Sequence, residues 1–429
     1  MGRAAPAGGA ALPATSVPVS GSDWFAVMVD EAMRRRLGRG HTSHLVVELE
    51  GRLPLAVLRD QLRGTPLHEA GRARLVVEAP WRPARWALVG PPTPVGHHAL
   101  PETADLDAEV VPALDAPLHH APVRLDLVDR EGRTDLVLSW SHALADARGA
   151  ERLALDAAAG RRDTRLLALP DAPPPRTVIE TLRRAKAARD ALFVGSLPRF
   201  TTLGRARRRE APRWARRAVP SSRVRAAAGR AGAGPFLLAF LVAVAAVEVA
   251  ALARSRGLPR RDVLVPAPLD RRRRGAPVAA LGNRLGVVIF RVPAAAVTDV
   301  RAATAACLGQ LRGRLRSGWP EDYDTLLALC RHLPVDLLGS LVGLPSGGRL
   351  ATFGLSYLAS GLGELRSWGG VPVRRAYHLP SNPVPPGLTV VATEAGDTLE
   401  LCVGHLPSLV SPAEADGLLA RLAAHLEEA

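Results

Sequence analysis

The chain has 429 residues, which is too long for one ordinary hydrophobic core, so two lobes are expected. Its composition, 47% hydrophobic and 23% charged, excludes a disordered protein and is typical of a globular one. The net charge of +15 rests almost wholly on arginine, since Lys186 is the only lysine. Because the sequence has neither zinc-ligand spacing nor an aromatic-interleaved basic strand, we expect no nucleic-acid binding.

Residues 1–20 contain no sustained leucine-rich stretch, so we predict a disordered lead-in rather than a signal peptide. The three cysteines, Cys307, Cys330 and Cys402, form no C-x-x-C pair and cannot all be bridged within the chain. This pattern favours a reducing environment. We therefore expect a cytoplasmic protein, with membrane association left open.

Residues 21–198 are predicted to form an N-terminal lobe. A helix is expected over 22–38, with Ser22 as its N-cap and Gly38 as its stop. Two strands, 123–128 and 135–142, are separated by a loop with a glycine, which predicts a β-hairpin. The other elements expected in this lobe are strands at 43–51 and 73–79 and helices at 53–64, 147–159 and 177–192.

Residues 199–217 are charged and lack an apolar period, which predicts a linker before a C-terminal lobe of residues 218–429. The apolar stretch 235–253 is long enough to cross a membrane, but Glu248 inside it favours a buried core helix. The last helix opens with Ser411 and Glu414 at capping-box spacing. The other elements expected here are strands at 262–270 and 285–293, helices at 299–317 and 322–343, and a hairpin at 388–405.

His142 stands where the second strand of the 123–142 hairpin ends. A strand end fixes the ring and leaves its tip free, which suits a general base because imidazole titrates near neutrality. Asp146 follows four residues later, across a tight turn. We expect its carboxylate to hold the turn through backbone N–H groups and to pair with an arginine, for which Arg148 and Arg284 are the candidates. The sequence contains no G-x-S-x-G and no H-E-x-x-H motif.

The stretch LVLSWSHALADARGAERL, residues 136–153, resembles the active-site segment of the chloramphenicol-acetyltransferase-like superfamily. That group includes the condensation domains of nonribosomal peptide synthesis and the bacterial wax ester synthase/diacylglycerol acyltransferases. Its motif is His-His-x-x-x-Asp-Gly after a strand. Here His142 and Asp146 keep the second histidine and the aspartate, whereas Ser141 and Ala147 replace the first histidine and the glycine.

The resemblance extends along most of the chain. VPVSGSDWFAVMV is similar to the family's N-terminal P-x-S-x-x-D opening, with Asp23 at the aspartate. LVPAPLDRRRRG and ALGNRLGVVIFRVP resemble the family's P-V-x-L-R and G-N strand pair, with Asn283 and Arg284. FGLSYLASGLG lies where many members carry Ser-Asn-x-x-G, but Tyr357 replaces the asparagine, whose role is therefore not carried over.

The resemblance implies an α/β fold of two chloramphenicol-acetyltransferase-like sandwich lobes with a tunnel between them. An acyl thioester on a pantetheine arm would enter from one face and an acceptor from the other. His142 would take the proton from the attacking hydroxyl or amine, a role typically worth about 10²–10⁴ in rate. A donor to the oxyanion is also needed. Its candidates are Ser141, Asn283 and Ser356, although Ser141 is also explained as a buried strand-end hydroxyl and Asn283 as a turn residue.

The arginine run 271–274 is a candidate for attracting the phosphates of a CoA donor or an acidic carrier protein. We take Arg271, Arg272 and Arg284 as candidate donor-binding residues. The alternative is that this run, and the run 205–210, are solvated and follow from the arginine-rich composition.

The first functional hypothesis is an acyltransferase that moves an acyl group from a CoA thioester to a hydroxyl or amine acceptor. One alternative is a free-standing condensation enzyme that uses a carrier-protein-bound donor. The other is a degenerate homologue that binds a lipid or a carrier protein without turnover, which the replacements at Ser141 and Ala147 motivate. No bound cofactor or metal is expected, since acyl-CoA or a phosphopantetheine thioester would be the co-substrate. A membrane surface, contacted peripherally, is a further candidate partner.

Overall fold

The computed structural model describes residues 16–77, 82–107, 111, 122–162, 166, 177–192, 200–272, 279–343 and 351–428. Most of the expected lead-in lies outside these residues. Its last part does not follow the expectation, because Ser16–Pro18 form strand β1, which pairs with β4 (Arg85–Leu88). β3 (Ala73–Val76) completes this small sheet on the other side of β4. Helix α1 (Gly21–Leu37) follows, and its N-cap is Ser20 in a capping box with Asp23, not Ser22 as expected.

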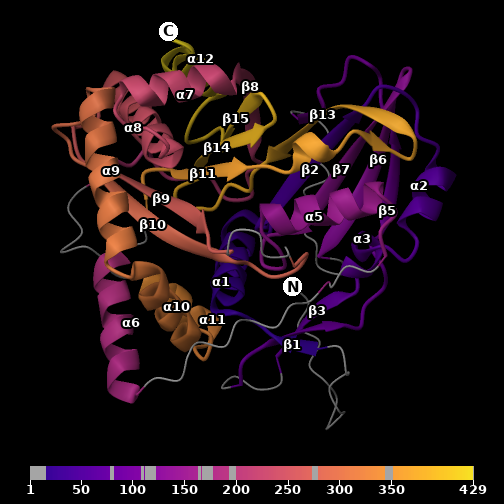
Figure 1. Ribbon diagram of the computed structural model, residues 1–429, viewed down its shortest axis with the longest axis horizontal. Coiled ribbons are helices and arrows are strands. Elements are labelled where there is room, and N and C mark those ends of the chain that lie inside the picture. The colour runs from indigo at the N-terminus through magenta and orange to yellow at the C-terminus, as the bar shows by residue number, and fades with distance from the viewer. Residues whose placement is uncertain are drawn as a thin grey trace.

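A six-stranded sheet with strand order β12-β13-β2-β7-β6-β5 forms the first lobe (Figure 1). The expected hairpin is confirmed, since β6 (Val123–Arg130) and β7 (Arg133–Ser141) pair antiparallel. Side chains alternate between the two faces of β7. Leu136, Leu138 and Trp140 therefore lie on one face, in a core that they share with helices of this lobe. The sheet also contains β2 (Thr42–Leu49) and β5 (Val95–Ala99), and the helices are α2 (Leu55–Leu62), α3 (Pro66–Ala70) and α5 (Ala147–Ala158).

The opposite face of this sheet packs on the second lobe. Val137 shares a small core with Val391 and Cys402 from the sheet of strand order β11-β14-β15-β8. The strands of that sheet are β8 (Arg213–Pro220), β11 (Gly354–Ala359), β14 (Leu388–Ala395) and β15 (Thr398–His405). The expected hairpin at 388–405 is therefore confirmed.

Two segments do not follow the expected division of the chain. Strand β8 takes up residues 213–217 of the expected linker, and its arginines suit it because an edge strand tolerates charged side chains. The strands β12 (Ser367–Trp368) and β13 (Val371–Leu379) come from the second half but join the first lobe, where β13 pairs with β2. The local sequence pattern of a strand does not indicate which distant strand it pairs with.

Helix α8 (Leu237–Ser255) is the long apolar helix of the second lobe, and 89% of its most apolar window is buried inside the protein. The expectation of a core helix is confirmed. Glu248 binds Arg421 at 2.6 Å and His425 at 2.8 Å, so its charge is compensated by α12 (Pro412–Glu427). The Ser411–Glu414 capping box of α12 is present as expected.

The helix expected over 322–343 is instead two helices, α10 (Trp319–Cys330) and α11 (Val335–Gly343). Pro334 lies between them, and proline cannot donate the hydrogen bond that would continue a helix. α6 (Val178–Leu192) crosses from the first half to pack on α10, where Arg184 binds Asp322 at 3.0 Å. The remaining elements are α7 (Ser221–Arg230), β9 (Val263–Asp270), β10 (Leu285–Val292), α9 (Val300–Arg316) and the 3₁₀ helix Leu362–Glu364.

Candidate active site

His142 is the first residue after β7, at the edge of the first lobe that meets the second. The register of β2 and β7 pairs Thr42 with Ser141, which places His41 opposite His142. The His142 amide donates to the His41 carbonyl at 2.7 Å, so the ladder continues one step past the strand. The two imidazole rings are stacked, with centroids 4.6 Å apart and an angle of 9° between their planes.

Both rings of this pair are held in their neutral form. Burial lowers the pKa of His142, and the negative charge of Asp146 opposes part of that shift. Burial also holds the pKa of His41 well below its usual range, and repulsion from His142 adds to it. Since a general base must be unprotonated to act, a depressed pKa keeps His142 available near neutral pH.

Asn283 fixes the backbone of His142 from the second lobe. Its Nδ2 group donates to the His142 carbonyl at 2.9 Å and to the Asp23 carboxylate at 3.0 Å. Its backbone amide donates to the same Asp23 oxygen at 2.6 Å. Gly282 precedes it with a φ of 97°, a conformation that favours glycine, and donates to the Leu144 carbonyl at 2.7 Å. The Asn283 amide is thus engaged in holding the loop.

Asp146 holds the other end of the loop 142–146, which we call the motif loop. Its side chain caps α5 by accepting from the Gly149 amide at 3.0 Å, and it accepts from the Arg284 amide at 3.0 Å. Its arginine partner is Arg272, with two contacts of 3.0 Å and side chains 9% and 2% exposed. Neither sequence candidate supplies this ion pair: Arg284 contributes its backbone, and Arg148 binds Asp270 at 2.8 Å.

The other predicted site residues lie in β7, in β11 and just after β9. Ser141 ends β7 and is buried, and its hydroxyl has no hydrogen-bond partner among the residues that the structure describes. Ser356 lies in β11, paired in register with Val391. Arg271 forms an ion pair with Asp324. Arg273 and Arg274 lie outside the described residues.

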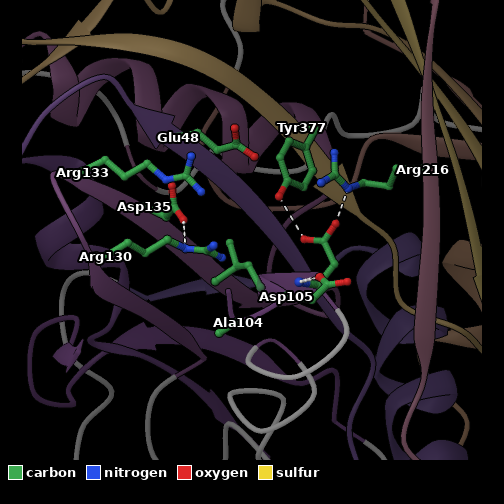
Figure 2. A pocket seen from close by; sticks show the side chains of 10 residues that line it. Glu48, Ala104, Asp105, Arg130, Arg133, Asp135, Arg216 and Tyr377 are labelled. Carbon is green, nitrogen blue, oxygen red and sulfur yellow. Dashed lines mark hydrogen bonds and ion pairs between the residues drawn. The ribbon is translucent and has the colours of Figure 1, made fainter. Parts of the chain in front are cut away.

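Figure 2 shows a polar pocket of about 170 Å³. Because Arg133 and Asp135 line it, the pocket lies at the other end of β7 from His142. Asp135 and His142 are seven residues apart along the strand, a span of about 23 Å at the rise of extended chain. In the pocket Asp135 binds Arg130 at 2.8 Å, and Tyr377 donates to Asp107 at 2.9 Å. The lining residues are Glu48, Ala104, Asp105, Leu106, Asp107, Arg130, Arg133, Asp135, Arg216 and Tyr377.

The sequence analysis missed His41 as a part of the site and expected a different role for Arg272. His41 follows a glycine at the start of a strand, and nothing local indicates which strand it faces. Arg272 belongs to the arginine run and was assigned to donor binding, whereas its guanidinium is largely buried against Asp146 and Asp270. Within the described part of the chain, no group of three or more His, Cys, Asp or Glu side chains could hold a metal ion.

No protein-family model matches the sequence, and no curated protein matches it. Solved structures do match its fold over nearly the whole chain. The first condensation domain of the CDA synthetase is 18% identical with a TM-score of 0.64, and the match covers 97% of each chain. The X-domain from teicoplanin biosynthesis is 19% identical with a TM-score of 0.61, covering 99% of this chain and 97% of the other.

A third similar structure is a variant of the starter condensation domain of rhizomide synthetase RzmA in complex with C8-CoA and Leu-SNAC. It is 15% identical with a TM-score of 0.60, and the match covers 96% of this chain and 94% of that one. Together these likenesses show that the chain has the α/β fold of the condensation domains, which is the fold that the sequence resemblance implies.

Proposed function

We propose that this condensation-domain fold is an acyltransferase that moves an acyl group from a thioester to a hydroxyl or amine acceptor, with His142 as the general base. The observation that carries the proposal is the arrangement around His142. A neutral imidazole stands at a strand end where the two lobes meet, and its backbone is fixed from the second lobe by Asn283. The structural neighbours crystallised with C8-CoA, Leu-SNAC or a substrate analogue support a thioester donor.

In the proposed reaction, the acceptor oxygen or nitrogen attacks the thioester carbonyl while the His142 ring takes its proton. The tetrahedral intermediate then expels the sulfur as the C–S bond breaks, and the proton on His142 passes to the thiolate. The products are an ester or amide and a free thiol, so the protons balance within the site. The lowered pKa of His142 supports both steps, because the ring is neutral before the attack and acidic enough afterwards to release its proton.

For the oxyanion we propose Ser141 as the donor in preference to Asn283. The Ser141 hydroxyl is buried and has no partner within the described part of the chain, so it is available for a new hydrogen bond. The Asn283 amide hydrogens are engaged by Asp23 and by the His142 carbonyl. Ser356 stays a weaker candidate, since no contact links it to the motif loop.

Two donors are compatible with this arrangement, namely acyl-CoA and an acyl group on a carrier protein. We favour acyl-CoA as the donor and keep the carrier-bound donor as the alternative. The second alternative is a homologue that binds thioester or lipid without turnover, because Ser141 and Ala147 replace two residues of the family motif.

Mass spectrometry of the products distinguishes the three functional hypotheses. The purified chain is incubated with acyl-CoA alone or with an acyl-loaded carrier protein, each with a mixture of alcohol and amine acceptors. A product from acyl-CoA that His142→Ala lacks supports the proposal. A product formed only from the loaded carrier supports the condensation enzyme. Absence of product with both donors, together with saturable binding of either, supports the non-catalytic homologue and contradicts the proposal.

A further inference from the structure

We propose that His41 is a positioning residue, which holds the His142 ring in place by stacking against it and takes no part in proton transfer. The proposal rests on the proposed function in one respect, that His142 is the base. The stacking is a property of the structure and can be tested without any reaction.

The stack follows from the strand register. β2 and β7 are antiparallel with Thr42 opposite Ser141, so the next residues outward, His41 and His142, face each other. The 2.7 Å bond from the His142 amide to the His41 carbonyl keeps the two backbones at ladder distance. With the ring planes 9° apart and the centroids at 4.6 Å, His41 gives the His142 ring a flat wall on one side.

Helix α1 fixes the backbone of His41. Its backbone amide donates to Asp30 Oδ1 at 2.7 Å, and Asp30 is bound by Arg34 at 2.6 Å with both side chains at most 10% exposed. Gly40 allows this close approach, since a Cβ at that position would lie 2.6 Å from Asp30 Oδ1 and 2.7 Å from Arg34 Nη2. His41 is 8% exposed, so its ring has little room to leave the stack.

The carboxylates around the stack are paired with other groups, so none of them offsets the effect of burial on His41. Asp30 is neutralised by Arg34 on α1, and Asp146 by Arg272 across the lobes. Asp23 is linked to the site because it accepts a hydrogen bond from Asn283. Burial raises the pKa of the Asp23 carboxyl. His41 Nδ1 is buried without a hydrogen-bond partner among the described residues, so the structure offers it no protein acceptor for a proton.

The neutral state of His41 affects how readily His142 can accept a proton. Burial and His142 together hold the pKa of His41 well below its usual range. When His142 takes the acceptor's proton, it becomes an imidazolium beside a neutral ring, and no second positive charge opposes it. A charged neighbour at 4.6 Å would disfavour that protonated state.

Two substitutions separate stacking from proton transfer. His41→Phe keeps a flat ring and removes both nitrogens, and His41→Ala removes the ring. We expect His41→Ala to lower kcat by about tenfold or more, because small misplacements of a catalytic group are costly, while the KM for the thioester changes little. His41→Phe should retain most of the wild-type kcat. The matched control is His97→Ala, which alters a half-exposed histidine of β5 and should leave kcat unchanged.

The second readout needs no activity. NMR titration of the His142 ring, assigned with His142→Gln, should give a higher pKa in His41→Ala, because removal of the neighbouring ring exposes His142 to water. In His41→Phe the pKa should stay low. If the wild type transfers no acyl group, the proposed function fails and this titration still decides the role of His41.

Two results would overturn the inference. The first is a folded His41→Ala protein in which either kcat or the titration of His142 is unchanged. The second is a folded His41→Phe protein as impaired as His41→Ala, since that would give His41 a role that depends on its nitrogens. Thermal melting of each variant establishes that it is folded.

Discussion

The Asp146 carboxylate binds the Arg272 guanidinium through two contacts of 3.0 Å. Asp146 belongs to the motif loop of the first half of the chain, and Arg272 follows strand β9 of the second. The same carboxylate caps α5 and accepts the Arg284 amide. One buried side chain thus joins the first turn of a helix, the start of β10 and the end of the β9 strand around the loop that carries His142.

Replacing Asp146 should therefore cost both stability and activity. Asp146→Asn keeps part of the hydrogen bonding and loses the ion pair, and removing one partner of a buried pair costs about 3–5 kcal/mol in free energy of unfolding. Chemical denaturation measures this loss, with Arg148→Gln as a control because its pair with Asp270 is partly exposed. An Asp146→Asn protein of unchanged stability with a shifted pH–rate profile would instead place Asp146 in the acid–base machinery.

Asn283 should matter through the backbone of His142. Asn283→Ala removes the bonds of its side chain to the His142 carbonyl and to Asp23, and the loss of a partner for buried acceptors costs about 1–3 kcal/mol. We expect a fall in kcat of about tenfold or more, since the loop is released on one side. Asp23→Asn keeps an oxygen acceptor and should be milder. Steady-state kinetics that show no change in kcat for folded Asn283→Ala would contradict this role.

Asp135 gives a prediction about pH. Burial raises the pKa of its carboxyl to about 6, and Arg130 opposes that shift while Glu48 adds to it. A carboxyl with a raised folded-state pKa contributes stability that is fully present below its unfolded pKa and is lost as pH rises through the folded value. The stability of the wild type relative to Asp135→Asn should therefore fall between about pH 4 and pH 6. Denaturant midpoints of both proteins across this range measure it, and a constant difference would contradict the raised pKa.

The arginines outside the buried pair retain a proposed role at the donor. Arg272 is committed to Asp146, so the test uses Arg273→Glu with Arg274→Glu, and the control uses Arg207→Glu with Arg208→Glu. If the run 271–274 attracts the donor, the first double variant should raise the KM for the donor and not for the acceptor. Added salt should act similarly, because exposed charges are screened over about 8 Å at physiological ionic strength. A donor KM insensitive to both changes would leave this run without a role.

The sequence predicted the parts of the fold that local patterns encode. Alternation marked the two hairpins, the capping box marked α12, and the strand followed by His142 and Asp146 marked the motif loop. The α/β condensation-domain fold followed from the order of several weak motifs and is confirmed.

What the sequence could not supply is contact between distant segments. The β2–β7 register brings His41 to His142 across about a hundred residues, and the lobes bring Arg272 to Asp146. The crossing of β13 into the first lobe has the same cause. Such contacts depend on tertiary packing, which side-chain periodicity along one segment does not report.

The measurement that tests the account most directly is single-turnover acyl transfer by His142→Ala. The wild type should form the ester or amide and release one thiol for each acyl group transferred. His142→Ala should bind the thioester with similar affinity, melt within a few degrees of the wild type, and transfer at least about a hundredfold more slowly, as expected for loss of a general base. Near-wild-type transfer by a folded His142→Ala protein would contradict the proposed mechanism.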